Sequence, residues 1–136
     1  MNPDFNRAAV CWRKAEAHLR EAVAQDADNS PMALIHSSYY AMFHAARAVL
    51  FQAVGDAPKR HDRAIQQFGL LVRNLDDALR SAGRAFNEVK DERTDADYDE
   101  SIAPSPDEAR EVPKAAINFL SVCGERYGFR SASPGP

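Results

Sequence analysis

The sequence predicts an all-α domain, an up-and-down bundle of four to five helices. Apolar residues recur at spacings of three and four along most of the chain, and no stretch alternates cleanly as a strand would. Helix start and stop signals stand at the ends of these periodic stretches. At 136 residues the chain can bury one core, so we expect a single domain over 1–128 and a flexible tail over 129–136.

The first helix is expected to begin at Asp4, an N-cap residue, and to run to about Gln25. Phe5, Trp12 and Leu19 recur every seven residues and mark the side that faces the bundle. Smaller apolar residues share that side: Ala8, Ala15, Ala22 and Val23. This pattern predicts one amphipathic helix that packs against the next one.

The central helix is expected between Ser30 and Gly55, because almost every position in this stretch is apolar or small. Ser30 supplies an N-cap hydroxyl, Pro31 the first helical position and Gly55 the stop. One line of polar side chains interrupts the apolar surface at spacings of four, four and three: His36, Tyr40, His44 and Arg47. The line is either a polar seam satisfied inside the bundle or the lining of a site for phosphate or RNA.

A third helix is expected after the break at residues 55–58, with its apolar positions at Ile65, Phe68, Val72, Leu75 and Leu79. Gly83 is expected to kink or end this helix, although Phe86 and Val89 continue the pattern loosely. Residues 90–105 are polar, rich in Asp and without an apolar period, so they predict a long loop.

The last helix has the clearest start signal in the chain. Ser105 is the expected N-cap, Pro106 takes the first position, and Glu108 completes a capping box. The buried side is predicted by apolar residues at helical spacing: Val112, Ala116, Phe119, Leu120 and Cys123. The helix is expected to end near Tyr127-Gly128, with Pro113 causing at most a kink.

Net charge and the distribution of apolar residues argue against some classes of function. A net charge of -3 argues against a broadly basic nucleic-acid binder but leaves room for a local basic patch. The dense patch is Lys59, Arg60, His61 and Arg63, which either binds phosphate or is simply a solvated corner. The sequence holds no run of 18 apolar residues and no signal segment, so we expect a cytoplasmic protein without a membrane span.

Metal binding and disulfide bonding are not expected. His36 and His44 lie two turns apart, about 12 Å along a helix, which is too far for one ion. Cys11 and Cys123 lack CxxC spacing and sit among apolar helical positions, so buried thiols are expected. We expect no cofactor.

Several ordered motifs resemble the HEPN domain family, in its branch of small prokaryotic proteins. The central helix carries Ser38-Tyr39-Tyr40-Ala41 and Phe43, followed by Gly55 and a turn with Pro58, Lys59 and His61. Arg93, Ala96, Asp97 and Tyr98 follow some thirty residues later. The resemblance covers about two thirds of the chain and implies a bundle of four to five helices, commonly a homodimer.

The resemblance also implies a function. Many HEPN proteins are metal-independent ribonucleases of toxin–antitoxin or defence systems, often encoded beside a nucleotidyltransferase-type antitoxin. Their signature is an Arg followed after four to six residues by a His, in which Arg stabilises charge on the phosphate and His moves a proton. Here Tyr98 stands five residues after Arg93, in place of the histidine.

Two functions therefore stay open. In the first, the protein acts on RNA or a nucleotide, with Arg93 as phosphate clamp and Asp97 and Tyr98 as the neighbouring catalytic residues. The RNA- or nucleotide-binding residues would then come from the central helix and the basic turn: Tyr40, His44, Arg47, Lys59, Arg60 and His61. In the second, the missing histidine marks a non-catalytic module that binds a nucleotide or a partner protein.

Overall fold

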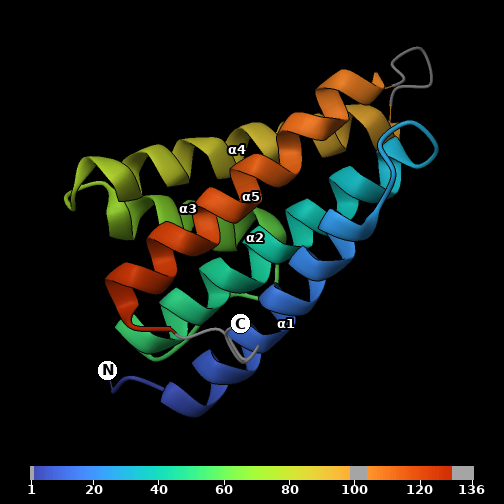
Figure 1. Cartoon of the computed structure of the whole chain (residues 1–136). Coiled ribbons are helices and arrows are strands. Elements are labelled where there is room, and N and C mark those ends of the chain that lie inside the picture. Colours follow the sequence, from blue (N-terminus) through green and yellow to red (C-terminus); the bar gives the residue numbers. More distant parts are fainter. Residues whose placement is uncertain (1, 99–103, 130–136) are drawn as a thin grey trace.

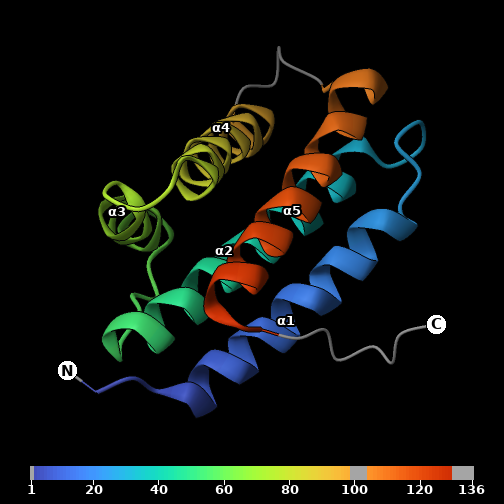
Figure 2. The ribbon, with the colours of Figure 1, turned by 60° about the vertical axis from the view of Figure 1, so that its left-hand side comes forward.

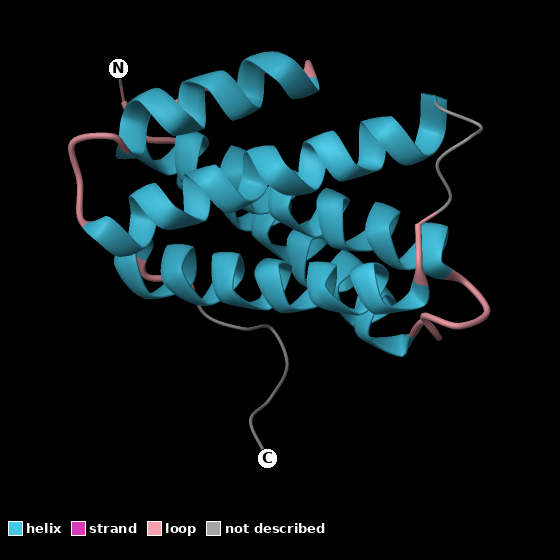
Figure 3. Ribbon diagram, turned by 90° about the horizontal axis from the view of Figure 1, so that it is seen from above, coloured by secondary structure: helices cyan, strands magenta, loops and turns pink. Residues whose placement is uncertain are grey.

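The computed structural model describes residues 2–98 and 104–129, without the side chains of residues 92 and 95–98. Within these ranges it contains five α-helices and no strand, which confirms the predicted fold class. The helices, in chain order, are α1 (Phe5–Ala24), α2 (Pro31–Val54), α3 (His61–Val72), α4 (Asp77–Tyr98) and α5 (Pro106–Tyr127). Figure 3 shows them joined by loops.

Helix α2 is the centre of the bundle. It contacts each of the other four helices, and its apolar positions from Leu34 to Phe51 are almost all buried. Tyr39, Met42 and Val49 have no exposed surface. Figures 1 and 2 show α5 lying along α2, with α1 on one flank and α3 and α4 on the other. Burial of a helix on most of its circumference is what its nearly charge-free sequence predicted.

The caps of α2 agree with the sequence in part. Gly55 ends the helix in the left-handed conformation with φ of 82°, and its N–H donates to the Phe51 carbonyl at 3.0 Å. A Cβ at Gly55 would lie 2.1 Å from the backbone oxygen of Asn2, so the start of the chain also requires glycine there. Ser30 occupies the N-cap position, but its hydroxyl makes no capping hydrogen bond, contrary to expectation.

The expected third helix is two helices. Helix α3 ends at Val72, and α4 begins at Asp77. The Asp76 carboxylate accepts a hydrogen bond from the Leu79 N–H at 3.0 Å, which is how an N-cap residue starts a new helix. Gly83 does not end a helix: it lies buried within α4.

The expected polar loop is largely helical, because α4 continues to Tyr98. Four of the first eight residues of this stretch are good helix formers: Lys90, Glu92, Arg93 and Ala96. Thr94 Oγ1 donates to the Lys90 carbonyl at 2.9 Å, and Arg93 packs over rings of α2.

The two outer helices carry the predicted caps. Asp4 accepts from the Arg7 N–H at 3.0 Å, and Ser105 Oγ accepts from the Glu108 N–H at 3.1 Å. On α1, Trp12 is buried, whereas Phe5 and Val23 are 63% and 59% exposed, so the predicted buried side was too wide. Cys11 and Cys123 are buried free thiols, as expected.

The end of α5 is also close to the prediction. Gly128 caps it with φ of 77°. Phe129, the first residue of the expected tail, stacks on Trp12 with ring centroids 4.6 Å apart. Residues 130–136 lie outside the described part of the chain.

Candidate functional site

The polar line of α2 lies on the side of the helix between α1 and α3. Tyr40, His44 and Arg47 are all half-buried, as is His36. Within the described residues α1 does not pack directly on α3 or α4, so these helices stand on either side of the line.

A buried hydrogen bond joins α2 to the start of α3. The Tyr39 hydroxyl lies 2.8 Å from Nδ1 of His61. The His61 ring also stacks on Phe43, with centroids 4.1 Å apart, and meets Tyr40 edge-on at 5.6 Å. His61 is half-buried, so one ring nitrogen is fixed while part of the imidazole remains accessible. The sequence placed Tyr39 on the apolar side of α2 and missed this role.

Arg93 of α4 lies over the same rings. Its guanidinium carbon is 4.7 Å from the Tyr39 ring centroid and 5.9 Å from that of Tyr40. These distances are those of cation–π contacts. The structure thus brings together three residues that lie far apart in the sequence, Arg93, His61 and Tyr39; we call them the Arg93 cluster.

The charges within the Arg93 cluster favour an uncharged histidine. Burial lowers the pKa of His61, and the positive charge of Arg93 lowers it further, while Asp62 acts in the opposite direction. Burial raises the pKa of Tyr39 to about 12, with Arg93 opposing the rise. At neutral pH the cluster therefore contains a cation, a neutral imidazole and a protonated phenol, a set that can bind a phosphate and exchange a proton.

A second group of rings adjoins Tyr40. His18 of α1 stacks on His44 with centroids 5.3 Å apart and lies 5.7 Å from the Tyr40 ring. His44 Nδ1 is buried and has no hydrogen-bond partner among the described residues. Burial lowers the pKa of His44 to about 4, and the nearby His18 and Lys14 add to the shift. Sequence reasoning missed His18, because no signal in one chain shows which side of α1 meets His44.

The other predicted binding residues have different surroundings. Arg47 Nε donates to the Pro58 carbonyl at 3.0 Å, and its guanidinium lies over Phe43 and Phe51. This side chain holds the loop that positions His61. Lys59 and Arg60 are exposed beside His61, and Arg60 pairs with Asp62 at 3.0 Å. Asp97 and Tyr98 belong to the last turn of α4, and their side chains lie outside the described part of the structure.

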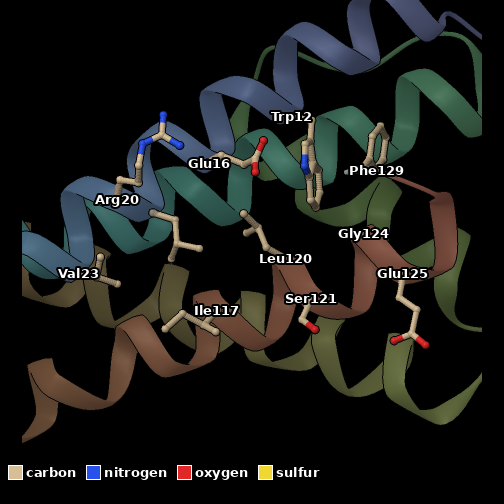
Figure 4. A pocket seen from close by; sticks show the side chains of 11 residues that line it. Trp12, Glu16, Arg20, Val23, Ile117, Leu120, Ser121, Gly124, Glu125 and Phe129 are labelled. Atoms are coloured by element: carbon tan, nitrogen blue, oxygen red, sulfur yellow. The ribbon is translucent and has the colours of Figure 1, made fainter. Parts of the chain in front are cut away.

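One hollow on the described surface contains none of the predicted site residues. It lies between α1 and α5 and has a volume of about 430 Å³. Figure 4 shows Leu120 and Ile117 of α5 facing Val23 of α1, with Trp12 and Phe129 at one end. Its lining is mainly apolar, and although it includes the carboxylates of Glu16 and Glu125 it brings no histidine beside them, so we do not place the site there.

No group of three or more His, Cys, Asp or Glu side chains in the described ranges could hold a metal ion. None of the described helices is long and apolar enough to cross a bilayer. A family profile described as HEPN domain matches residues 8–126, which is most of the chain. No curated protein matches the chain at a significant level.

Proposed function

We propose that this chain, which belongs to the HEPN domain family, acts on RNA, and that the Arg93 cluster is its ribonuclease site. The observation that carries the proposal is the hydrogen bond between the Tyr39 hydroxyl and Nδ1 of His61 beneath Arg93. The signature histidine is absent after Arg93, yet a half-buried imidazole stands in the same cluster, supplied by α3 instead.

The chemistry assigned to the cluster needs no metal. The ribose 2′-hydroxyl attacks the adjacent phosphorus, forms a 2′,3′-cyclic phosphate and expels the 5′-oxygen of the next nucleotide, which takes a proton from water. In this step Nδ1–H of neutral His61 donates to the Tyr39 oxygen, so Nε2 can take the proton of the 2′-hydroxyl, and the Arg93 guanidinium stabilises the charge that grows on the phosphate oxygens. Tyr39 is a positioning residue, because its hydroxyl fixes the His61 ring.

A cleavage assay tests this assignment. Purified protein is incubated with a mixed RNA pool in a chelator, and wild type is compared with Arg93→Ala, Arg93→Lys and His61→Ala. We expect wild-type cleavage, near-complete loss in both alanine variants, and partial activity in Arg93→Lys, because lysine keeps the charge but not the forked donors. Arg13→Ala, at an exposed position of α1, is the matched control and should cleave normally.

Two results would overturn the ribonuclease proposal. The first is cleavage that the chelator abolishes and added metal restores. The second is cleavage that survives His61→Ala at unchanged thermal stability.

A second candidate is RNA or nucleotide binding without cleavage. It is favoured by Tyr98 at the position of the signature histidine and by the packing of Arg93 on two rings of α2, which joins α4 to the core. In this case no variant cleaves RNA, while Arg93→Ala still weakens binding of a labelled oligonucleotide. Fluorescence anisotropy separates the two functions.

We also propose a cytoplasmic homodimer that pairs with a nucleotidyltransferase-type antitoxin. Support comes from the family, whose members often dimerise, and from the polar side chains Tyr40, His44 and Arg47 of α2, which are only half-buried in this chain. Sedimentation equilibrium tests the dimer, and co-purification with the product of a neighbouring nucleotidyltransferase gene tests the pairing. A monomer at all concentrations would remove the dimer from the proposal.

A further inference from the structure

Helices α3 and α4 lie side by side on the flank away from α1, as Figure 2 shows, and two adjoining hollows run between them. Their volumes are about 300 Å³ and 200 Å³. Both are lined by Gly69 of α3 and Asn87 of α4, so they form one continuous groove. We call it the α3–α4 groove.

The charged residues that line the α3–α4 groove are mostly cations: Lys90, Arg73, Arg80 and Arg84, against the single carboxylate of Asp62. This excess of positive charge stands out in a chain whose net charge is -3. Asn87 and Gln66 add amide donors between the cations. A groove with spaced cations and amides fits a polyanion, and a phosphodiester backbone presents its charges at such intervals.

The partners of Arg80, Arg84 and Lys90 in the α3–α4 groove lie at the protein surface and are not buried. Arg80 pairs with Asp77, and Lys90 lies 3.6 Å from Asp91, in both cases at exposed positions of α4. Arg84 donates to the Ser81 hydroxyl at 3.0 Å. Exposed pairs of this kind contribute little in water, so a phosphate oxygen can replace either partner at small cost.

Gly69 faces open space in the groove. A Cβ built on Gly69 meets no atom within 4 Å, so a larger side chain there would fill part of the groove without disturbing the core. Gly83 differs, because a Cβ there would meet Val72 at 3.4 Å.

The groove leads to the Arg93 cluster. Asp62 at one end of it follows His61 directly, and Lys90 precedes Arg93 by three residues, one helical turn of α4. From Arg80 to Arg93 the helix rises about 20 Å, enough for several nucleotides of an extended strand. A strand in the groove would therefore enter the cluster from the α3–α4 side.

We propose that the α3–α4 groove binds the phosphate backbone of single-stranded RNA and guides it to Arg93 and His61. The inference rests on the proposed action on RNA and adds the form of the substrate, a single strand of several nucleotides rather than a free nucleotide.

The test measures binding apart from cleavage. Anisotropy titrations use a fluorescent 2′-O-methyl RNA 12-mer, which lacks the attacking hydroxyl. Arg73→Gln/Arg84→Gln should weaken binding about tenfold and lower the slope of log K against log salt by about one to two. The matched control is Arg13→Gln/Arg20→Gln on α1. Cleavage of a dinucleotide, too short to reach the groove, should be unchanged in both double variants.

Gly69→Leu supplies a second variant without a change of charge. It should weaken binding of the 12-mer while the protein stays folded, because the side chain enters the groove rather than the core. Equal affinities for the groove variants and the α1 control would overturn the inference. So would an acidic peptide of similar charge that competes as well as the 12-mer, because the partner would then be a protein. Dinucleotide cleavage tests the Arg93 cluster alone, and binding of the 12-mer to the groove variants tests the groove. Either proposal can therefore fail while the other holds.

Discussion

Acid should destabilise this fold through His44, and the size of the effect follows from its surroundings. Burial, then the charges of His18, Lys14, Arg47 and His61, lower the pKa of His44 from 6.5 to about 4. His44 is therefore protonated below about pH 6.5 in the unfolded chain, but only below about pH 4 in the folded protein. Stability from His44 is fully present above pH 6.5 and is lost as the pH falls toward 4.

Between pH 7 and pH 5 the full pKa shift would lower the free energy of unfolding by about 2 kcal/mol. Because the His44 ring is only half-buried, water screens part of the effect, and we expect the free energy of unfolding to fall by about 1 kcal/mol. His61, whose pKa is also lowered, acts in the same direction. Urea denaturation of wild type at both pH values measures the loss, and His44→Phe, which keeps a ring in place, should show a loss smaller by about 1 kcal/mol.

The reasoning has a direct check. Nuclear magnetic resonance titration of the imidazole protons should give His44 a midpoint near pH 4. A midpoint near 6.5 for His44, or an equal loss of stability in wild type and His44→Phe, would refute the argument from burial.

Two further predictions concern single contacts. Tyr39→Phe removes the 2.8 Å hydrogen bond to His61 but keeps the ring under Arg93, so the free energy of unfolding should fall by about 1 kcal/mol and the cleavage rate should fall with little change in KM. A cleavage rate equal to that of wild type would contradict the positioning role. Gly55→Ala should destabilise by about 2 kcal/mol or more, because φ is 82° and the new Cβ meets the Asn2 oxygen; a urea midpoint like that of wild type would contradict it.

The sequence predicted a helix best where burial alone decides which residues it contains. Helix α2 could be predicted closely, because nearly every position is apolar and Pro31 and Gly55 mark its ends. The break between α3 and α4 was missed because Val72, Leu75 and Leu79 keep helical spacing across it. Asp76 held the missing signal, since its side chain caps Leu79. The polar end of α4 was missed because its stabilising contacts come from Arg93 and not from an apolar row.

The candidate site could be predicted only in its separate pieces. The line of Tyr40 and His44 follows from helical spacing, and Arg93 and His61 were singled out through the family resemblance. Their meeting depends on how α3 and α4 pack on α2, which no local pattern contains. Tyr39 shows the difficulty best: its ring is fully buried and reads as core, while its hydroxyl makes the polar contact that positions His61.

In the proposed site, His61 takes the place of the signature histidine that is absent after Arg93. A histidine close in sequence to Arg93 would reach the same phosphate from α4, whereas His61 reaches the cluster from the start of α3, through the loop that Arg47 holds by the Pro58 carbonyl. Cleavage would then depend on this loop as much as on the Arg93 cluster itself. Sequence motifs that require both residues on one segment would miss such a site, since its two groups are joined only by the packing of α3 and α4 on α2.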